Sequence, residues 1–307
     1  MALLEVEKLS VSFTQYTKGL RQTTVQTITD LHLTVSTGEI VAVFGSSGSG
    51  KSLLAHAILG ILPDNARMSG TIRYDGTPLD PGRLEELRGQ EIALVPQSVN
   101  YLDPLMRVGA QARTNAAGSD PAAAQRAMFE RYGLEESVDR LYPFQLSGGM
   151  ARRVLVAAAA ISGARLLIAD EPTPGMHPND LEEALGTFRE LADGGCAVVF
   201  ITHDIEAALK VADRVAVFYA GTTVEIAPAA DFSGDGERLR HPYSKALWRA
   251  LPQNGFVPIP GHQPHPQELP PGCLFAPRCG IASAACMKRR PEMREIRDGE
   301  TRCIHAS

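Results

Sequence analysis

The sequence predicts an α/β fold with a small cysteine-rich extension at its C-terminal end. The first observation is an apolar strand pattern at residues 39–44 that continues into a glycine-rich stretch and then into residues with helical apolar spacing. The second is a pair of short apolar runs, residues 166–170 and 196–202, typical of buried parallel strands. The third is that four of the five cysteines lie between residues 273 and 303.

Length and composition exclude several classes of protein. The chain has 307 residues, of which 44% are hydrophobic and 21% charged, and these fractions are ordinary for a globular protein. This length predicts about two structural units. The net charge of −5 argues against a protein that coats nucleic acid, because such a protein needs a basic surface. We therefore expect no nucleic-acid partner.

No predicted segment crosses a membrane. A spanning helix needs about 20 apolar residues, whereas the apolar run at residues 154–164 lies between Arg153 and Arg165. The first ten residues carry glutamates where a signal peptide would be apolar. We expect a cytosolic chain, in which a disulfide framework is disfavoured.

The remaining elements follow in chain order. Residues 3–13 and 28–35 alternate apolar and polar side chains and predict two strands around a polar turn. Residues 52–62 predict a helix, and residues 104–153 are alanine-rich and helical with breaks at Gly118, Pro121 and Pro143. Residues 211–227 predict a final hairpin.

A proline-rich stretch separates the C-terminal unit from the rest. Seven prolines fall between residues 252 and 271, and proline at this density favours an extended chain over a helix. We predict a main domain at residues 1–228, a connecting segment with a proline-rich linker at 229–271, and a four-cysteine unit at 272–307.

The glycine-rich stretch after the first buried strand matches the phosphate-binding pattern G-x-x-x-x-G-K-[ST]. Its residues are Gly45, Ser46, Ser47, Gly48, Ser49, Gly50, Lys51 and Ser52. Its backbone N–H groups and the start of the following helix suit a phosphate. Lys51 is expected to reach the β- and γ-phosphates, and Ser52 to ligate Mg²⁺. The alternative is a flexible Ser/Gly loop, which the flanking strand and helix disfavour.

A second apolar strand, residues 166–170, ends in two carboxylates. Asp170 at the strand end suits coordination of Mg²⁺, and Glu171 is then placed to polarise an attacking water. The alternative is a buried strand that simply meets solvent. The phosphate-binding loop favours the catalytic interpretation.

The stretch Leu146–Met150, with the sequence LSGGM, resembles the signature motif of the ATP-binding cassette (ABC) ATPases. Gln97 resembles the family's Q-loop glutamine, and His203 its switch histidine. The resemblance covers about residues 2–225. It implies a P-loop ABC ATPase fold with a mixed-sheet core, an N-terminal antiparallel β subdomain and a helical signature subdomain at about residues 100–155.

The resemblance also implies the cofactors and the composite site. Two such domains meet head to tail around two ATP molecules, and Ser147, Gly148 and Gly149 of one contact the γ-phosphate held by the other. Catalysis is assigned to Lys51, Gln97, Glu171 and His203, and Mg²⁺ to Ser52, Gln97 and Asp170. An aromatic side chain stacks on adenine; Phe13 and Tyr16 are the candidates, and Tyr16 is preferred.

The segment after Glu171 departs from the family. His177 stands where an aspartate is usual, in a loop that contacts the opposite ATP site. We expect weaker communication across the dimer, with hydrolysis retained at the site built on Lys51.

Three short stretches resemble the importers for oligopeptides, dipeptides and nickel: residues 100–106, residues 142–145, with Phe144 in place of a histidine, and residues 241–247. This branch implies ATP-driven uptake of di- or oligopeptides. It also implies a second ATPase subunit (a paralogue), two membrane permease subunits and an extracytoplasmic solute-binding protein. The chain would then lie peripherally on the cytoplasmic face of the inner membrane. Alternatives are nickel or metal-chelate cargo, a soluble ABC ATPase outside transport, or a redox or metal sensor.

The C-terminal cysteines have the spacing C-x₅-C-x₆-C-x₁₆-C, at Cys273, Cys279, Cys286 and Cys303. This is similar to the extension of the peptide importers, which can hold an iron–sulfur cluster. Four thiolates suit a [4Fe–4S] cluster and also Zn²⁺, but no pair has the C-x₂-C spacing usual in zinc ribbons. We favour the cluster over Zn²⁺ and over four reduced thiols in a loose tail. The remaining cysteine, Cys196, is expected to be a buried hydrophobic residue, and the nearby histidines His262, His265 and His305 are expected to be solvated.

Overall fold

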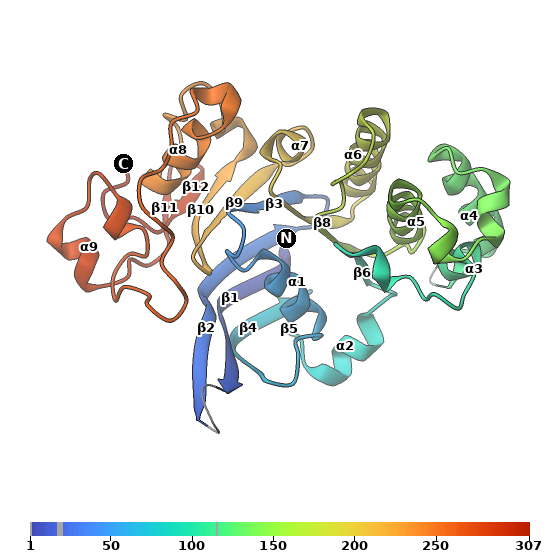
Figure 1. The fold of residues 1–307 in the computed structure, drawn as a ribbon, viewed down its shortest axis with the longest axis horizontal. Coiled ribbons are helices and arrows are strands. Elements are labelled where there is room, and N and C mark those ends of the chain that lie inside the picture. The colour runs from blue at the N-terminus through green and yellow to red at the C-terminus, as the bar shows by residue number, and fades with distance from the viewer. Residues whose placement is uncertain (1, 17–20, 115) are drawn as a thin grey trace.

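The computed structural model describes residues 2–16, 21–114 and 116–307, which form two β-sheets with helices packed around them (Figure 1). The strands are β1 (Ala2–Tyr16), β2 (Gln22–Ser36), β3 (Ile40–Gly45), β4 (Ala66–Tyr74), β5 (Thr77–Pro78), β6 (Ile92–Val95), β7 (Leu166–Asp170), β8 (Ala197–Thr202), β9 (Arg214–Tyr219), β10 (Thr222–Pro228), β11 (Arg294–Ile296) and β12 (Gly299–Thr301). The α-helices are α1 (Lys51–Leu59), α2 (Pro81–Leu87), α3 (Val108–Arg113), α4 (Pro121–Arg131), α5 (Gly148–Ala160), α6 (Pro178–Asp193), α7 (Ile205–Leu209), α8 (Pro242–Arg249) and α9 (Ala284–Lys288).

The smaller sheet is antiparallel and has the strand order β2-β1-β4-β5. Its long β1–β2 hairpin confirms the two strands predicted from alternation, and the alternating apolar residues Leu4, Val6, Leu9 and Val11 of β1 are buried. Residues 17–20 of the predicted turn lie outside the described residues.

The larger sheet has the order β11-β12-β10-β9-β3-β8-β7-β6. Strands β6, β7, β8, β3 and β9 are parallel, whereas β10, β12 and β11 join antiparallel. The predicted mixed sheet and the hairpin at β9–β10 are therefore confirmed. Strands β3, β7 and β8 are buried along their whole length, as their uninterrupted apolar sequences predict.

The two faces of the central strands belong to two different apolar cores. Ile40, Ala42 and Phe44 of β3 pack into the core that also contains residues of α5 and α6. Val41 and Val43 face the other core, which is shared with α1 and the antiparallel sheet. The period-two alternation of a strand thus fixes α1, and the loop before it, between the two sheets.

Helices α3, α4 and α5 form a helical subdomain at one end of the molecule, opposite to α9 (Figure 1). Pro121 begins α4 rather than interrupting a helix, because a proline at the first helical position has no hydrogen bond to lose. Asp120 accepts a hydrogen bond from the backbone N–H of Ala123 and caps the same helix.

The C-terminal extension is attached to the main sheet. Strand β12 pairs with β10, and Arg302 is buried, where it donates to the Asp30 carboxylate at 2.7 Å and to the backbone oxygen of Thr223 at 3.1 Å. Residues 255–275 form neither helix nor strand, as their proline content predicts. The domain boundaries proposed from the sequence remain predictions. Within the described residues, no helix is both long and apolar enough to span a membrane.

Candidate active site

The chemically active residues predicted from the sequence lie where three neighbouring strands end. The loop at residues 45–52 follows β3, Asp170 ends β7, and His203 follows β8. These strands are adjacent and parallel in the order β3-β8-β7. Their carboxyl ends therefore meet at one edge of the sheet, which is where open α/β sheets bind ligands.

Two glycines give the phosphate-binding loop its shape. At Gly45 a Cβ atom would lie only 2.4 Å from the backbone oxygen of Phe218 on β9, so that any side chain would displace the loop. Gly50 has a φ of +94° at the N-terminal cap of α1, and glycine adopts this left-handed conformation at little cost. The loop thus enters α1 with its backbone N–H groups available to a phosphate.

Lys51 is held inside this loop. Its Nζ donates to the backbone oxygens of Gly45 at 2.8 Å and Ser46 at 3.2 Å. Burial lowers the pKa of Lys51, and the charges of Glu171 and Asp170 oppose that shift. The ammonium group is therefore already at the phosphate position, and it can exchange carbonyl partners for phosphate oxygens.

Ser52 and Asp170 form the predicted magnesium pair. The Ser52 hydroxyl donates to the Asp170 carboxylate at 3.1 Å. Burial raises the pKa of Asp170, while this hydrogen bond partly offsets the shift. Gln97 lines the same pocket. A hydroxyl, a carboxylate and an amide oxygen are hard ligands that fit Mg²⁺.

Glu171 is held against His203. The carboxylate oxygen Oε2 lies 2.7 Å from His203 Nδ1, and the side chain of Glu171 is 9% exposed whereas that of His203 is 66% exposed. The Glu171 backbone has a φ of +49°, which is uncommon for a non-glycine residue, and its N–H donates to the oxygen of Ile201 at 2.9 Å. The end of β7 therefore places the buried carboxylate of Glu171 beside the imidazole of His203, which is exposed to solvent.

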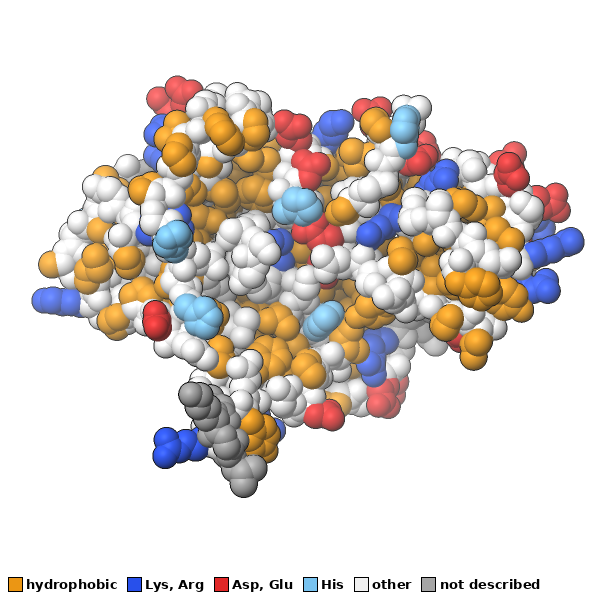
Figure 2. Space-filling view, viewed as in Figure 1, with side chains coloured by type: hydrophobic (Ala, Val, Ile, Leu, Met, Phe, Trp, Pro, Cys, Tyr) orange, Lys and Arg blue, Asp and Glu red, His pale blue; other side chains and the backbone are white. Residues whose placement is uncertain are grey.

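Lys51, Ser52, Gln97, Glu171 and His203 line one pocket of about 530 Å³, and Asp170 lies behind it in contact with Ser52. This volume is typical of small-molecule sites. The pocket's lining residues are Thr27, Ser47, Gly48, Gly50, Lys51, Ser52, Leu53, Gln97, Glu171, Pro174 and His203. In Figure 2, basic, acidic and histidine side chains meet near the middle of the face, close to the position of β3 and β8. Thr27 was not predicted, because nothing in the sequence marks a strand residue of the other sheet as part of this site.

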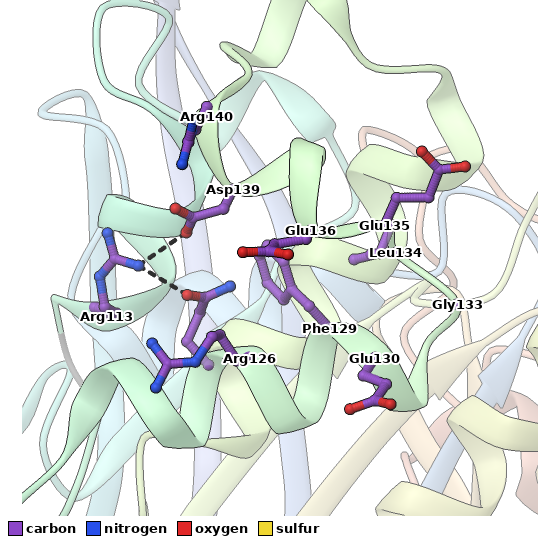
Figure 3. A pocket seen from close by; sticks show the side chains of 11 residues that line it. Arg113, Arg126, Phe129, Glu130, Gly133, Leu134, Glu135, Glu136, Asp139 and Arg140 are labelled. Atoms are coloured by element: carbon purple, nitrogen blue, oxygen red, sulfur yellow. Dashed lines mark hydrogen bonds and ion pairs between the residues drawn. The ribbon is translucent and has the colours of Figure 1, made fainter.

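A larger pocket, of about 640 Å³, lies in the helical subdomain (Figure 3). There Arg113 donates to Gln125 and Asp139, each at 2.8 Å. None of the phosphate-loop residues, Asp170, Glu171 or His203 lines it. The nucleotide site is therefore assigned by its chemistry rather than by pocket size.

Comparison with known proteins identifies the family. Residues 28–174 match the family model for the ABC transporter, and residues 224–286 match the model for the C-terminal region of oligopeptide/dipeptide transporters. A provisionally named peptide import ATP-binding protein of Brucella abortus (strain 2308) is 34% identical over 98% of this chain and 94% of its own length. The chain belongs to the ABC transporter family. Its activity is that of an ABC ATPase, which hydrolyses ATP.

Other matches agree with this assignment. The dipeptide transport ATP-binding protein of Escherichia coli (strain K12) is 34% identical over 99% of this chain and 97% of its own length. Among solved structures, a dimeric ATP-binding cassette in a post-hydrolysis state, bound to ADP and Pi, matches with a TM-score of 0.63 and 26% identity. That match covers 74% of this chain and 98% of the other. The predicted family, fold class and ATPase activity are confirmed.

The ABC signature residues begin α5. The Ser147 hydroxyl caps this helix by accepting from the backbone N–H of Met150 at 3.2 Å. A Cβ atom at Gly148 or Gly149 would meet no atom within 4 Å, so packing within this chain does not require glycine there. None of these residues lines the pocket that contains Lys51. Within one chain, the signature residues therefore do not contribute to the pocket around Lys51.

The structure does not bring the two adenine candidates to the pocket. Phe13 is partly buried against the apolar core that includes the antiparallel sheet. Tyr16 is 68% exposed, and its hydroxyl accepts a hydrogen bond from Gln22. Adenine stacking stays a prediction. His177, the departure from the family, caps α6 by accepting from the backbone N–H of Asn179 at 3.5 Å.

Arg152 is a site residue to which the sequence analysis assigned no role. Its guanidinium group, on α5, donates to the backbone oxygens of Gln97 and Glu171, both at 2.9 Å. Burial lowers the pKa of Arg152, and the charge of Glu171 opposes the shift. One side chain thus joins α5 to the backbone of Gln97 and to the backbone of Glu171. No local pattern could reveal a clamp between backbone atoms so far apart in the chain.

We expect Arg152→Ala to lower kcat for ATP roughly tenfold and to lower Tm by a few degrees. The variant leaves the backbone oxygen of the buried Glu171 without this donor, which costs about 1–3 kcal/mol, and removes a second hydrogen bond to the exposed Gln97. Steady-state ATPase assays and thermal unfolding test this. Arg126→Ala is the control, because Arg126 lines only the pocket of the helical subdomain. Wild-type kcat in Arg152→Ala would show that the clamp is dispensable.

The four C-terminal cysteines are brought together. Cys273, Cys279, Cys286 and Cys303 line one cavity of about 10 Å³, and all are free thiols. Burial raises the pKa of Cys273 and of Cys279. Among the described residues, no group of three or more His, Cys, Asp or Glu side chains has the geometry to hold a metal ion. Cys196 lies apart and is buried, and burial raises its pKa to about 11, as expected of a hydrophobic residue.

The three histidines near the cysteines are exposed, as expected. His262 and His265 lie in the proline-rich segment and do not line the cavity. His305 does line it, and its Nε2 lies 3.0 Å from the Ser283 hydroxyl. The sequence did not mark the buried His241, which lines the same cavity from the start of α8.

Proposed function

We propose that this chain is the ATP-hydrolysing subunit of an importer for di- or oligopeptides. The observation that carries the proposal is the match of residues 224–286 to the C-terminal region of oligopeptide/dipeptide transporters, downstream of the pocket that contains the phosphate-binding loop. The relatives from Brucella abortus and Escherichia coli, which bear peptide and dipeptide names, are matched over nearly the whole chain. These names favour peptide over nickel or a metal chelate as cargo.

The pocket residues support a direct mechanism of hydrolysis. Lys51 and the loop N–H groups would hold the phosphates, and Ser52, Asp170 and Gln97 would hold Mg²⁺; Ser52 already contacts Asp170, and Lys51, Ser52 and Gln97 line one pocket. Glu171 would orient and polarise the attacking water. His203, which contacts Glu171, would stabilise the negative charge that develops on the γ-phosphate. Catalysis in this scheme is positioning plus electrostatic stabilisation.

A head-to-tail pair completes each site. The signature of this chain lies away from its own Lys51, and its glycines have open space around them. A similar cassette is described as a dimer with ADP and Pi. We infer that Ser147, Gly148 and Gly149 contact the nucleotide of a second ATPase subunit, a paralogue or an identical chain.

The membrane permease subunits would dock beside the Q-loop. Exposed apolar side chains follow Gln97 there: Tyr101, Leu105 and Met106. They adjoin a groove of about 330 Å³ whose lining includes Leu94, Tyr101, Leu155 and Ala159. This surface connects the helical subdomain to the ATP site. The chain would then lie peripherally on the cytoplasmic face of the inner membrane, with a solute-binding protein on the other side.

This docking surface can be tested by co-purification of the assembled transporter. We expect Leu105→Asp to remove the permease subunits from the complex, because Leu105 is 87% exposed and apolar and a buried unpaired charge is costly. Val257→Asp, at a 54% exposed site in the C-terminal extension, is the matched control. Retention of the permeases by Leu105→Asp, or their equal loss with Val257→Asp, would contradict the proposed surface.

We further propose that the four C-terminal cysteines ligate a [4Fe–4S] cluster, with Zn²⁺ as the alternative. Four thiols from distant positions line one buried cavity. His241 lies there too: its Nδ1 accepts from the backbone N–H of Tyr243 at 3.0 Å, and its buried Nε2 has no partner. Because Nδ1 accepts, the Nε2 of His241 carries a proton and can donate to a thiolate or sulfide in this cavity. A cluster bound by the four cysteines would cross-link the C-terminal extension.

The metal content decides this proposal. Protein purified without oxygen is expected to be brown, with about four iron atoms per chain. The Cys279→Ser variant is expected to be colourless and to have a lower Tm. Cys196→Ala, which changes a buried cysteine outside the cavity, should keep the iron. One zinc per chain would establish the alternative, and neither metal would contradict both.

A further inference from the structure

The phosphate-binding loop is contacted from outside the ATPase core. Ser46, its second residue, donates a hydrogen bond from Oγ to the side-chain oxygen of Gln263 at 2.7 Å. Gln263 lies 217 positions later in the chain, in the proline-rich segment. The Ser46 hydroxyl is thus directed to Gln263, and Ser46 is not among the residues that line the pocket, whereas the next residue, Ser47, is.

A second C-terminal residue lies close to the same serine. The hydroxyl of Tyr243, in the first turn of α8, is near enough to Ser46 that the serine side chain and backbone lower the pKa of Tyr243, against the larger opposite effect of burial. The ring of Tyr243 is 2% exposed, and it packs against Tyr219 with ring centroids 4.3 Å apart. Because Tyr219 ends β9, which pairs with β3, the ring is braced against the strands that carry the loop.

The start of α8 is itself rigidly placed. His241 caps the helix at the backbone N–H of Tyr243, and burial lowers the pKa of His241 to about 3, so that the ring stays neutral and its Nδ1 can accept. The buried Glu225 on β10 accepts from the backbone N–H groups of Arg240 at 2.7 Å and His241 at 2.8 Å. These bonds fix the backbone from which the Tyr243 side chain extends toward Ser46.

The segment that precedes Gln263 is bonded to the four-cysteine unit. Arg278, next to Cys279, donates to the backbone oxygens of Ile259 at 3.1 Å and Pro260 at 2.8 Å, and to the Tyr219 hydroxyl at 3.2 Å. Phe275, which lines the cysteine cavity, packs edge-on against Tyr219 and Tyr243. A continuous set of contacts therefore joins the cysteine unit to the back of the phosphate-binding loop.

We propose that Tyr243 and Gln263 are positioning residues of the ATP site: they hold Ser46 from behind, so that the C-terminal extension sets the conformation in which the loop binds MgATP. The C-terminal extension then contributes directly to the affinity of the nucleotide site for MgATP. This inference rests on the assignment of the loop to MgATP and is independent of which cargo is transported.

The expected effect is on nucleotide affinity. A hydrogen bond is worth about 1 kcal/mol, so we expect Gln263→Ala and Tyr243→Phe each to raise the Kd for MgATP about three- to tenfold. KM for ATP should rise in step, with kcat within about twofold, because no catalytic group is touched. Tyr243→Phe removes only the hydroxyl and keeps the buried ring, and Gln263→Ala removes the amide group together with one methylene.

The experiment is titration of the purified full chain with MgATP and steady-state ATPase assays, with Tm as the check on folding. Gln267→Ala, an exposed glutamine in the same segment, and Tyr132→Phe, which removes a buried hydroxyl bonded to Thr187 in the helical subdomain, are the matched controls and should bind normally.

A double-mutant cycle separates positioning from general stability. If Gln263 acts through Ser46, then Gln263→Ala should add no further loss of affinity in a Ser46→Ala background. Wild-type affinity in Gln263→Ala and Tyr243→Phe would overturn the proposal, and so would losses that simply add to that of Ser46→Ala. A failure to import peptide would leave these binding results unchanged, so the two proposals fail separately.

Discussion

Glu171→Gln is expected to lower ATP turnover at least about 100-fold while the Kd for MgATP stays within about twofold of the wild type. The change keeps the size and hydrogen-bonding capacity of the side chain but removes the charge that polarises water, and general-base catalysis contributes about 10²- to 10⁴-fold. In the proposed site, other residues would hold the phosphates and Mg²⁺, namely Lys51, Ser52 and Asp170, so binding should persist. Single-turnover hydrolysis and MgATP titration measure the two effects.

The matched control is Glu182→Gln. Glu182 lies on α6 in an exposed ion pair with Lys210, and exposed pairs of this kind contribute little. This control should hydrolyse ATP normally. Turnover by Glu171→Gln near the wild-type rate would remove Glu171 from the mechanism, and a large loss of MgATP affinity would mean that its role is structural.

Gly149→Asp is expected to lower ATPase activity of the assembled complex roughly 100-fold, the cost of losing a transition-state donor. The new carboxylate would stand at the start of α5, where the proposed dimer places the γ-phosphate of the other subunit, and like charges repel there. It would not disturb this chain, because a Cβ at Gly149 meets nothing within 4 Å and aspartate is favourable in a first helical turn.

Two readouts distinguish this effect from a local defect. The isolated Gly149→Asp chain should bind MgATP at its own loop with unchanged Kd, since the signature does not line that pocket. Gly186→Asp on α6, where a Cβ also meets nothing within 4 Å, should leave the complex active. Normal activity of the Gly149→Asp complex would contradict the head-to-tail site.

The parts of the fold and site that the sequence predicts are those fixed by local physical rules. Period-two alternation marks β1 and β2, uninterrupted apolar runs mark β3, β7 and β8, and the loop before Lys51 follows a spacing that phosphate binding imposes. Asp170, Glu171 and His203 could be expected to meet because parallel strands bring their carboxyl ends to one edge.

The features that escaped prediction depend on contacts between distant segments. Arg152 bonds to backbone atoms, which carry no sequence signal, and its partners lie 55 and 19 positions away. Strands β11 and β12 are three residues each, too short for alternation to show. The bond between Ser46 and Gln263 requires the proline-rich segment to fold back over the sheet, and composition predicts only that this segment is extended.

ATP-dependent uptake of peptide by the assembled transporter tests the central claim most directly. The complex would be reconstituted in lipid vesicles, with MgATP on the side of this subunit and a labelled dipeptide with the solute-binding protein on the other. We predict that the wild-type complex accumulates dipeptide against its gradient, and that Glu171→Gln abolishes accumulation while Glu182→Gln does not. Uptake of Ni²⁺ but not of any di- or oligopeptide, or dipeptide uptake that persists in Glu171→Gln, would contradict the account.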